Sequence, residues 1–221
     1  MRTSRPDIRP SHRRVPRHRT RPHAFRGLII ASGALLVAAM CALPAGISEP
    51  EEGVFDAVNH LPDFLAWVLW VPMQAGAALG PVVLAAVAWL VWRRLRPALD
   101  LLIAGEAAYV LAKVVKQWLG RGRPAAFFDD VQFHGHSRPG TEAGLGFPSG
   151  HTAVAFAMAV VVMPYLTIRW RVAVGLLAGV VALARLYFGA HLPLDTIGGA
   201  ALGVAVGACV HLLMDLVTHR H

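Results

Sequence analysis

Charged residues are scarce in this chain: they make up 15% of its 221 residues, whereas apolar residues make up 56%. Because soluble domains carry about 25% charged residues, this composition argues against an ordinary water-soluble globule. It also argues against intrinsic disorder over most of the length. Cysteine is almost lacking as well. Cys41 and Cys209 both lie within apolar runs, which excludes a disulfide scaffold and a cysteine-based zinc site.

The net charge of +8 is confined to the N-terminus. Nine Arg and a single acid, Asp7, fall within residues 1–26, and the rest of the chain is neutral overall. This segment is rich in Pro and His and lacks apolar periodicity, so we expect a disordered tail. Nucleic-acid binding is one interpretation of such an arm. The sequence favours another, in which Arg beside an apolar span stays in the cytoplasm and contacts anionic lipid headgroups, with no nucleic-acid partner.

Six apolar runs follow the tail, at 27–46, 73–92, 97–115, 152–168, 172–190 and 196–214. A helix needs about 20 residues to cross the hydrocarbon core of a membrane, and the first run has no charge over its whole length. A cleaved signal peptide is the alternative for this run, but its length favours a retained helix. Between the first two runs, an acidic and then amphipathic segment with Trp67 and Trp70 predicts an external interfacial helix.

We therefore predict an all-α integral membrane six-helix bundle over residues 27–215, with a basic cytoplasmic tail at 1–26 and a short cytoplasmic tail at 216–221. Gly199, Gly203 and Gly207 recur at four-residue spacing in the last run, a stripe suited to close helix packing. The basic turns at 93–96 and 169–171 fall on the same side of this bundle as both tails. The positive-inside rule makes that side the cytoplasmic face of the cell membrane.

The outer side should then be poor in Lys and Arg, yet it holds Lys116, Arg121, Arg123, Arg138 and Arg185. Anion binding is the obvious reason for basic residues that break the topological rule, because Arg binds phosphate oxygens in a bidentate fork. Ser149 and Gly150 lie at the predicted start of a helix on this side, where unpaired N–H groups also favour an anion.

Two histidines on the outer side, His151 and His191, suit a reaction that needs a nucleophile and a general acid. His191 and Asp195 are four residues apart, so their side chains come within reach if Pro193 opens a helix. A carboxylate in that place would fix the imidazole tautomer and stabilise its cationic form. Together with the cations, these residues indicate phosphoryl-transfer chemistry.

Three segments carry this chemistry: Lys-x6-Arg-Pro at 116–124, Pro-Ser-Gly-His at 148–151 and Arg-x5-His-x3-Asp at 185–195. In this order they resemble the three-part signature of the type 2 phosphatidic acid phosphatase (PAP2) superfamily, which includes membrane lipid phosphatases, soluble acid phosphatases and vanadium haloperoxidases. One departure is Ala184, which stands where the third motif often has Ser. We expect a small effect from it on phosphate binding or loop packing.

The resemblance implies a role for each motif residue. His191 would attack phosphorus to form a phosphohistidine, with Asp195 orienting its imidazole. His151 would protonate the leaving oxygen and then activate water. The phosphoryl oxygens would be held by Lys116, Arg123, Ser149, Gly150 and Arg185. The resemblance implies no metal and no other cofactor, because the cationic side chains take the place of a metal.

The expected function is therefore that of a membrane lipid phosphatase acting at the outer leaflet. The candidate substrates are an isoprenoid diphosphate, phosphatidic acid, phosphatidylglycerol phosphate and a polyprenyl-phosphosugar phosphate, which motifs that contact only phosphate do not separate. The alternative is a non-catalytic lipid-phosphate transporter or binding protein on the same scaffold. The two histidines and Asp195 disfavour it, since binding alone needs only cations. A vanadate-dependent peroxidase is disfavoured by the short, apolar chain.

Other polar residues have more modest interpretations. Lys116 and Arg121 could instead be interfacial groups whose charged ends extend toward water. For Lys116 the sequence favours a functional role, and for Arg121 the two interpretations have equal weight. His134, His136 and Arg138 lie in the loop before the second motif. His-x-His suggests a metal site, but without a third ligand a solvated loop at the substrate is favoured. Glu106 and Lys113 are predicted to form a buried ion pair, with contact to a lipid headgroup as the alternative, and His211 and Asp215 a local hydrogen-bonded pair.

Overall fold

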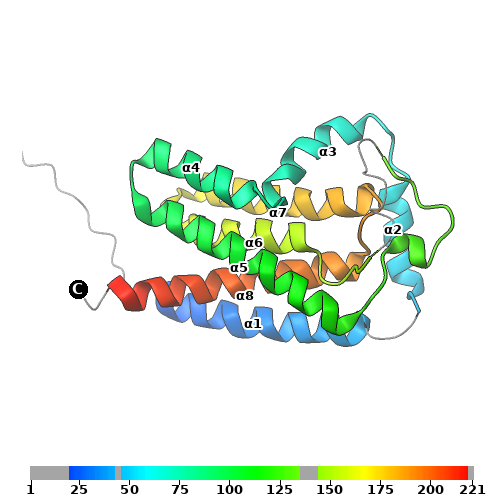
Figure 1. Ribbon diagram of the computed structural model, residues 1–221, viewed down its shortest axis with the longest axis horizontal. Coiled ribbons are helices and arrows are strands. Elements are labelled where there is room, and N and C mark those ends of the chain that lie inside the picture. The colour runs from blue at the N-terminus through cyan, green and yellow to red at the C-terminus, as the bar shows by residue number, and fades with distance from the viewer. Residues whose placement is uncertain (1–19, 43–45, 135–143, 219–221) are drawn as a thin grey trace, which may run out of the picture.

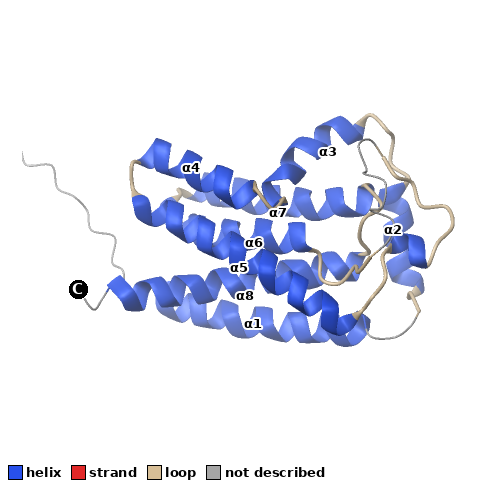
Figure 2. Ribbon diagram, viewed as in Figure 1, coloured by secondary structure: helices blue, strands red, loops and turns tan. Residues whose placement is uncertain are grey.

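The structure is a computed structural model that describes residues 20–42, 46–134 and 144–218. Its regular elements in these ranges are all helical, which confirms the predicted all-α class (Figures 1 and 2). The α-helices are α1 (Thr20–Ala42), α2 (Glu49–Asn59), α3 (Leu65–Met73), α4 (Gly80–Trp92), α5 (Leu95–Leu119), α6 (Gly150–Val162), α7 (Ile168–Tyr187) and α8 (Pro193–Thr218). The first helix begins at Thr20, within the segment 1–26 that we predict as a tail, and the boundary at residue 26 stays a prediction.

The centre of the bundle is built from small side chains, which let the helices approach closely. Its core includes Ala104 and Ala108 of α5 and Ala157 of α6, all with no exposed surface. The predicted glycine stripe of α8 faces α6. A Cβ at Gly199 would lie 2.5 Å from the Ser149 carbonyl oxygen, so only glycine allows this approach. The tight α6–α8 contact fixes the start of α6 against the start of α8.

Within the described ranges, three helical segments are long and apolar enough to cross a membrane: Ala24–Ala42, Ile168–Tyr187 and Pro193–Leu216. The pair Leu65–Gly76 and Gly80–Trp92 would count as a fourth span, although it is bent by 80°. The two other predicted spans do not meet this test, because α5 carries Asp100, Glu106 and Lys113 and α6 has only 13 residues. The six-span count therefore remains a prediction.

The predicted run at 73–92 is not one helix, because the chain breaks between α3 and α4. At the break Gly76 lies directly against the backbone of His151, where a Cβ would overlap the carbonyl oxygen. Gly80 lies equally close to the carbonyl oxygen of Ala75. The bend therefore holds the end of α3 over the beginning of α6, close to the second motif.

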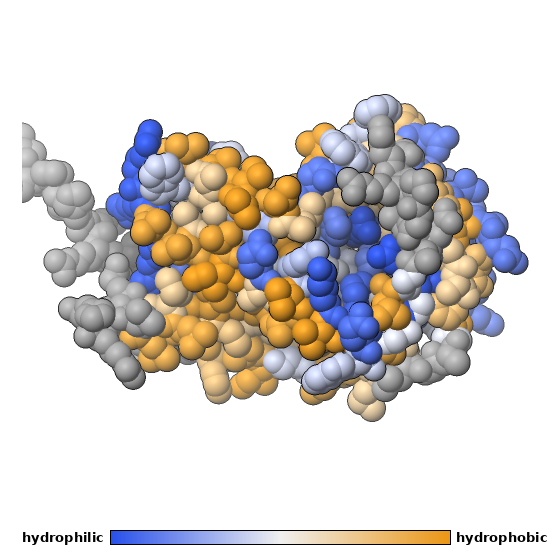
Figure 3. Space-filling model, in the orientation of Figure 1, coloured by the Kyte–Doolittle hydropathy of each residue, from blue (hydrophilic) through white to orange (hydrophobic). Residues whose placement is uncertain are grey.

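The basic turns and the three motifs lie at opposite ends of the bundle. The α4–α5 turn, the start of α7 and the end of α8 lie at one end, and α2 with the loops that carry the three motifs lies at the other (Figure 1). Apolar residues cover much of the flank between them, and polar residues gather toward both ends (Figure 3). The separation of the basic turns from the motifs agrees with the predicted arrangement.

Candidate active site

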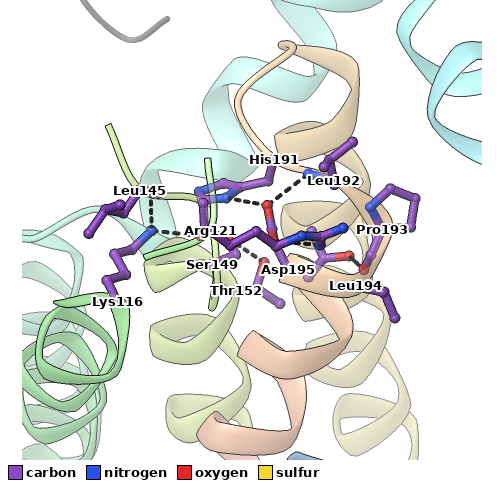
Figure 4. Close-up of polar contacts among 12 residues, drawn as sticks. Lys116, Arg121, Leu145, Ser149, Thr152, His191, Leu192, Pro193, Leu194 and Asp195 are labelled. Carbon is purple, nitrogen blue, oxygen red and sulfur yellow. Dashed lines mark hydrogen bonds and ion pairs between the residues drawn. The ribbon is translucent and has the colours of Figure 1, made fainter. Parts of the chain in front are cut away.

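The three motifs converge at one end of the bundle, where α5, α6, α7 and α8 each contribute one end (Figure 4). Lys116 lies in the last turn of α5, and its Nζ donates to the carbonyl oxygens of Leu145 (2.9 Å) and Gly146 (2.8 Å). This lysine thereby joins the first motif to the loop that leads into the second. It is half-buried within the site, which disfavours its interpretation as an interfacial group alone.

Arg185 is buried near the end of α7, with 8% of its surface exposed. Its Nη1 lies 3.3 Å from the Met73 sulfur, and no carboxylate of the described residues forms a salt bridge with it. Burial also lowers the pKa of Arg123, which lies in the loop after α5. A buried cation without an acid is costly, so this end of the bundle is prepared for an anion.

His191 is buried between α7 and α8, and its backbone N–H donates to the Arg185 carbonyl oxygen at 3.2 Å. Burial lowers the pKa of His191 well below its ordinary value, and the positive charges of Lys116, Arg185 and Arg123 lower it further, as does His151. The imidazole is therefore neutral at physiological pH. Charged residues from the first and third motifs, and His151 of the second, thus all act on this one ring.

Asp195 stands in the first turn of α8, which begins at Pro193 as predicted. Its Oδ2 lies 3.3 Å from Nδ1 of His191 and accepts the Leu192 N–H at 2.9 Å (Figure 4). The predicted contact between His191 and Asp195 is therefore present. With Nδ1 facing the carboxylate, Nε2 is the ring nitrogen left for a substrate.

Ser149 caps α6, and Gly150 is its first residue, so both occupy the predicted helix start. Ser149 is fully buried, its N–H donates to the Asp195 carbonyl oxygen at 2.8 Å, and its hydroxyl accepts from Thr152 at 3.0 Å. These bonds connect the second motif to the third. His151 follows in the first turn of α6 and is partly buried.

Glu51 is a site residue that the sequence analysis missed, and Arg121 is one that it undervalued. Arg121 is not an interfacial group: its side chain and that of Glu51 are each 4% exposed, with Nη2–Oε2 at 2.7 Å and Nη1–Oε1 at 3.1 Å. Nη1 also donates to Oδ1 of Asp195 at 3.2 Å. Burial opposes the charge on Arg121, but Glu51 and Asp195 outweigh it and raise the pKa of the guanidinium.

His134 has a structural place in the described part of the chain. Its Nδ1 lies 2.7 Å from Asp63, its Nε2 lies 2.6 Å from the Asn59 carbonyl oxygen, and its ring stacks on Tyr187. The described residues contain no group of three or more His, Cys, Asp or Glu side chains placed to hold a metal. His136 and Arg138 lie outside the described residues.

The two local pairs predicted on the helices do not form among the described residues. Lys113 Nζ lies 4.4 Å from the Tyr109 ring centroid instead of pairing with Glu106. Asp215 accepts from Nη2 of Arg96 at 3.0 Å instead of from His211. In both cases a neighbour from the preceding turn or from another helix replaces the predicted partner.

Comparison with known families gives a match that includes all eight predicted site residues. The model of the PAP2 superfamily matches residues 97–218. The chain belongs to the PAP2 superfamily. This confirms the resemblance drawn from the three motifs.

Two curated relatives are lipid A 1-phosphatases, from Rhizobium johnstonii and Rhizobium etli. Each is 36% identical to this chain over 97 residues, which is 42% of the chain. The matched part covers only 38% and 40% of those relatives' own lengths. Similarity of this extent supports membership of the family.

Two solved structures share the fold. Aquifex aeolicus LpxE matches with a TM-score of 0.64 and 24% identity, over 72% of this chain and 93% of that chain. The first transmembrane PAP2 type phosphatidylglycerolphosphate phosphatase from Bacillus subtilis matches with a TM-score of 0.69 and 22% identity, over 86% and 97%. These matches establish the architecture, and the chain accordingly has the helices of a membrane PAP2 protein.

Proposed function

We propose that this protein is a membrane lipid phosphatase that hydrolyses a phosphate or diphosphate headgroup through a phosphohistidine intermediate. One observation carries the proposal: His191 is buried and neutral, and three cations act on it. One of these cations, Arg185, has no acid partner among the described residues. Such a site attracts a phosphoryl group and presents a nucleophile to it. Family membership gives the same expectation.

The first chemical step would be attack by Nε2 of His191 on phosphorus. As the N–P bond forms and the P–O bond to the lipid breaks, positive charge develops on the imidazole, and Oδ2 of Asp195 stabilises it through Nδ1–H. Lys116, Arg123 and Arg185, with the Ser149 hydroxyl and the N–H of Gly150, would hold the phosphoryl oxygens as their charge increases. His151 would donate a proton to the leaving oxygen.

The second step would return the enzyme to its starting state. His151, now deprotonated, takes a proton from a water molecule, whose oxygen attacks phosphorus as the N–P bond breaks. The products are inorganic phosphate and neutral His191, with the proton back on His151. Three cations and the imidazole of His151 act on His191, and they would stabilise the charge that develops during this cycle.

The substrate would keep its apolar chains in the bilayer while its headgroup enters the site. The curated relatives suggest a phosphate carried on a glycolipid, as in lipid A, and the Bacillus subtilis neighbour suggests phosphatidylglycerol phosphate. Isoprenoid diphosphate, phosphatidic acid and polyprenyl-phosphosugar phosphate remain candidates on the same chemistry. A non-catalytic lipid-phosphate carrier is disfavoured, because binding needs the cations but not a carboxylate-oriented histidine.

A panel of these lipids tests the proposal. We expect purified protein to release inorganic phosphate from at least one of them, without loss of activity in EDTA and with inhibition by vanadate, which mimics the five-coordinate transition state. The His191→Ala protein is the control. Absence of release from every lipid, or activity abolished by EDTA and restored by Mg²⁺, would contradict the proposed chemistry.

The same proposal places the site at the outer face of the membrane, with both termini in the cytoplasm. A reporter inserted in the 93–96 turn should behave as cytoplasmic, as should one fused after residue 221, and one inserted within 127–140 should behave as external. Cytoplasmic behaviour of the 127–140 reporter would contradict an outer-leaflet substrate. The basic residues of the motifs would then lie in the cytoplasm, where the positive-inside rule already predicts them.

A further inference from the structure

We propose that Glu51 and Arg121 are positioning residues that hold Asp195, and through it His191, in the geometry for attack on phosphorus. This inference rests on the proposed function. Neither residue faces the phosphoryl site as a ligand in the proposed mechanism. Their contacts with Asp195 and with the start of α8 carry the argument.

Arg121 forms salt bridges with two carboxylates, Glu51 and Asp195. Glu51 engages both terminal nitrogens of the guanidinium, and Nη1 is shared between Glu51 and Oδ1 of Asp195. A planar fork held at one edge has little freedom at the other. Glu51 thereby fixes the donor that binds Asp195.

Glu51 also holds Asp195 from the backbone side. Its Oε1 accepts the N–H of Leu194 at 3.0 Å, one residue before Asp195 in the first turn of α8. That N–H is one of the donors that a helix start leaves unpaired, so a carboxylate there stabilises the turn. The two oxygens of Asp195 are consequently divided: Oδ1 binds Arg121, and Oδ2 binds the Leu192 N–H and His191.

Glu51 is held in place by α2. The buried residues of this helix, Glu51, Phe55 and Asn59, recur every four positions and so share one face. Phe55 stacks on Phe128, with ring centroids 5.6 Å apart. Asn59 donates to the carbonyl oxygen of Tyr187 at 2.9 Å, close to the third motif. This helix is therefore fixed against the loop after α5 and against the end of α7, and Glu51 enters the site from a fixed support.

The contribution expected from such an arrangement is to kcat rather than to substrate binding. Outer partners of this kind typically change activity by about 10- to 100-fold when removed. Glu51→Gln should therefore lower kcat by about 10- to 100-fold and leave KM for the lipid phosphate within about twofold. Arg121→Lys keeps one donor for Asp195 but loses the fork, so its loss should be smaller than that of Arg121→Gln.

The matched control is Glu52→Gln, since Glu52 is exposed on the same helix. In an Asp195→Asn background, Glu51→Gln should cost nothing further, because the residue acts through Asp195. A loss of equal size in both backgrounds would overturn the proposal, and so would a Glu51→Gln protein that behaves like Glu52→Gln.

A second readout is independent of turnover. In protein labelled with ¹⁵N-histidine, the imidazole signals of His191, assigned with a His191→Gln variant, report its tautomer and the hydrogen bond at Nδ1. We expect Glu51→Gln and Arg121→Lys to shift these signals as Asp195→Asn does, and Glu52→Gln to leave them unchanged. Unshifted signals in both variants would refute the positioning role. Wild-type protein without any phosphatase activity would instead refute the proposed function, and the imidazole signals would still decide this inference.

Discussion

Basic residues at the two ends of the bundle are in opposite environments. At the end formed by the α4–α5 turn and the start of α7, Arg93, Arg94, Arg169 and Arg171 are exposed. At the other end Arg121 and Arg185 are buried. The residues at both ends are arginines that flank apolar runs in the sequence. Only at the second end are their guanidinium groups buried away from water. Burial of cations, rather than their number, distinguishes the end that we propose to bind an anion.

Polar pairs at the two ends differ in the same way. Away from the site, Arg96 and Asp215 form a half-exposed salt bridge, and the buried carboxylate of Asp100 accepts from the Tyr165 hydroxyl at 2.6 Å. Each contact there joins two helices. At the site end Arg121 serves two carboxylates, and Arg185 serves none among the described residues. The first end pairs its charged groups with partners on neighbouring helices, whereas the buried Arg185 at the second end has no carboxylate partner among the described residues.

The largest predicted effect is at the nucleophile. His191→Ala should abolish turnover, and Asp195→Asn should lower kcat by about 10⁴-fold, as loss of the orienting carboxylate does in a catalytic triad. Both should be measured as phosphate release by protein whose helix content equals that of the wild type. Normal turnover by His191→Ala would show that another residue attacks phosphorus.

The next effect is at the buried cation. Arg185→Gln should lower kcat by about 10²- to 10³-fold, because it removes a charge aimed at the transition state from a site shielded from water. The exposed Arg169→Gln is the control and should keep wild-type activity. Equal activity of the two variants would remove the distinction between the ends of the bundle.

His151→Ala should separate the two roles of the histidines. Its loss should slow hydrolysis of lipid substrates by about 10²- to 10⁴-fold, the usual contribution of a general acid. An activated ester such as p-nitrophenyl phosphate needs no proton on its leaving group, so part of its attack step should survive. An equal loss of the phosphorylation rate with both substrates would contradict the assignment of His151 as the acid.

The lowered pKa of His191 predicts how the site responds to acid. An ordinary histidine gains its proton near pH ~6.5, whereas burial and the surrounding cations keep His191 neutral to lower pH. In ¹⁵N-histidine spectra of the folded protein, the His191 imidazole should titrate below this value, and in unfolded protein near it. Because the unfolded chain then binds the extra proton, stability should fall as pH drops through this range. Titration at or above the ordinary value would contradict the electrostatic description.

The smallest effects belong to the end without the site. Asp215→Asn should cost less than about 1 kcal/mol of stability, since it removes only the half-exposed salt bridge with Arg96. Tyr165→Phe should cost about 1–3 kcal/mol, because Asp100 is buried and loses its donor. Thermal unfolding in detergent measures both, and phosphate release should be unchanged. A loss of turnover in either variant would show that the two ends are coupled.

Features that depend on local sequence could be predicted before the structure. Pro193 opens a helix because its fixed φ suits the first turn, so the His191–Asp195 contact follows from spacing alone. The glycine stripe of α8 likewise predicts close packing. The convergence of the three motifs could also be predicted. Each motif lies where one span ends or the next begins, and in antiparallel neighbours these ends lie on the same side.

Features that depend on distant contacts could not be predicted. Arg121 and Glu51 are separated by 70 positions, and Glu51 lies in an acidic segment that resembles a solvated loop. The bend between α3 and α4 follows from the contact of Gly76 with His151, which an apolar run does not reveal. The partners of Lys113 and Asp215 were also missed, because spacing gives the residues within reach but not the preferred one.

Trapping the phosphoenzyme tests the central claim most directly. Protein mixed with ³²P-labelled lipid phosphate and quenched within one turnover should carry label that is stable to base and labile to acid, as phosphohistidine is. Peptide mapping should place it on His191, with no label in His191→Ala and more label in a variant that hydrolyses the intermediate slowly. Label that persists in His191→Ala, or acid-stable label on another residue, would contradict the account.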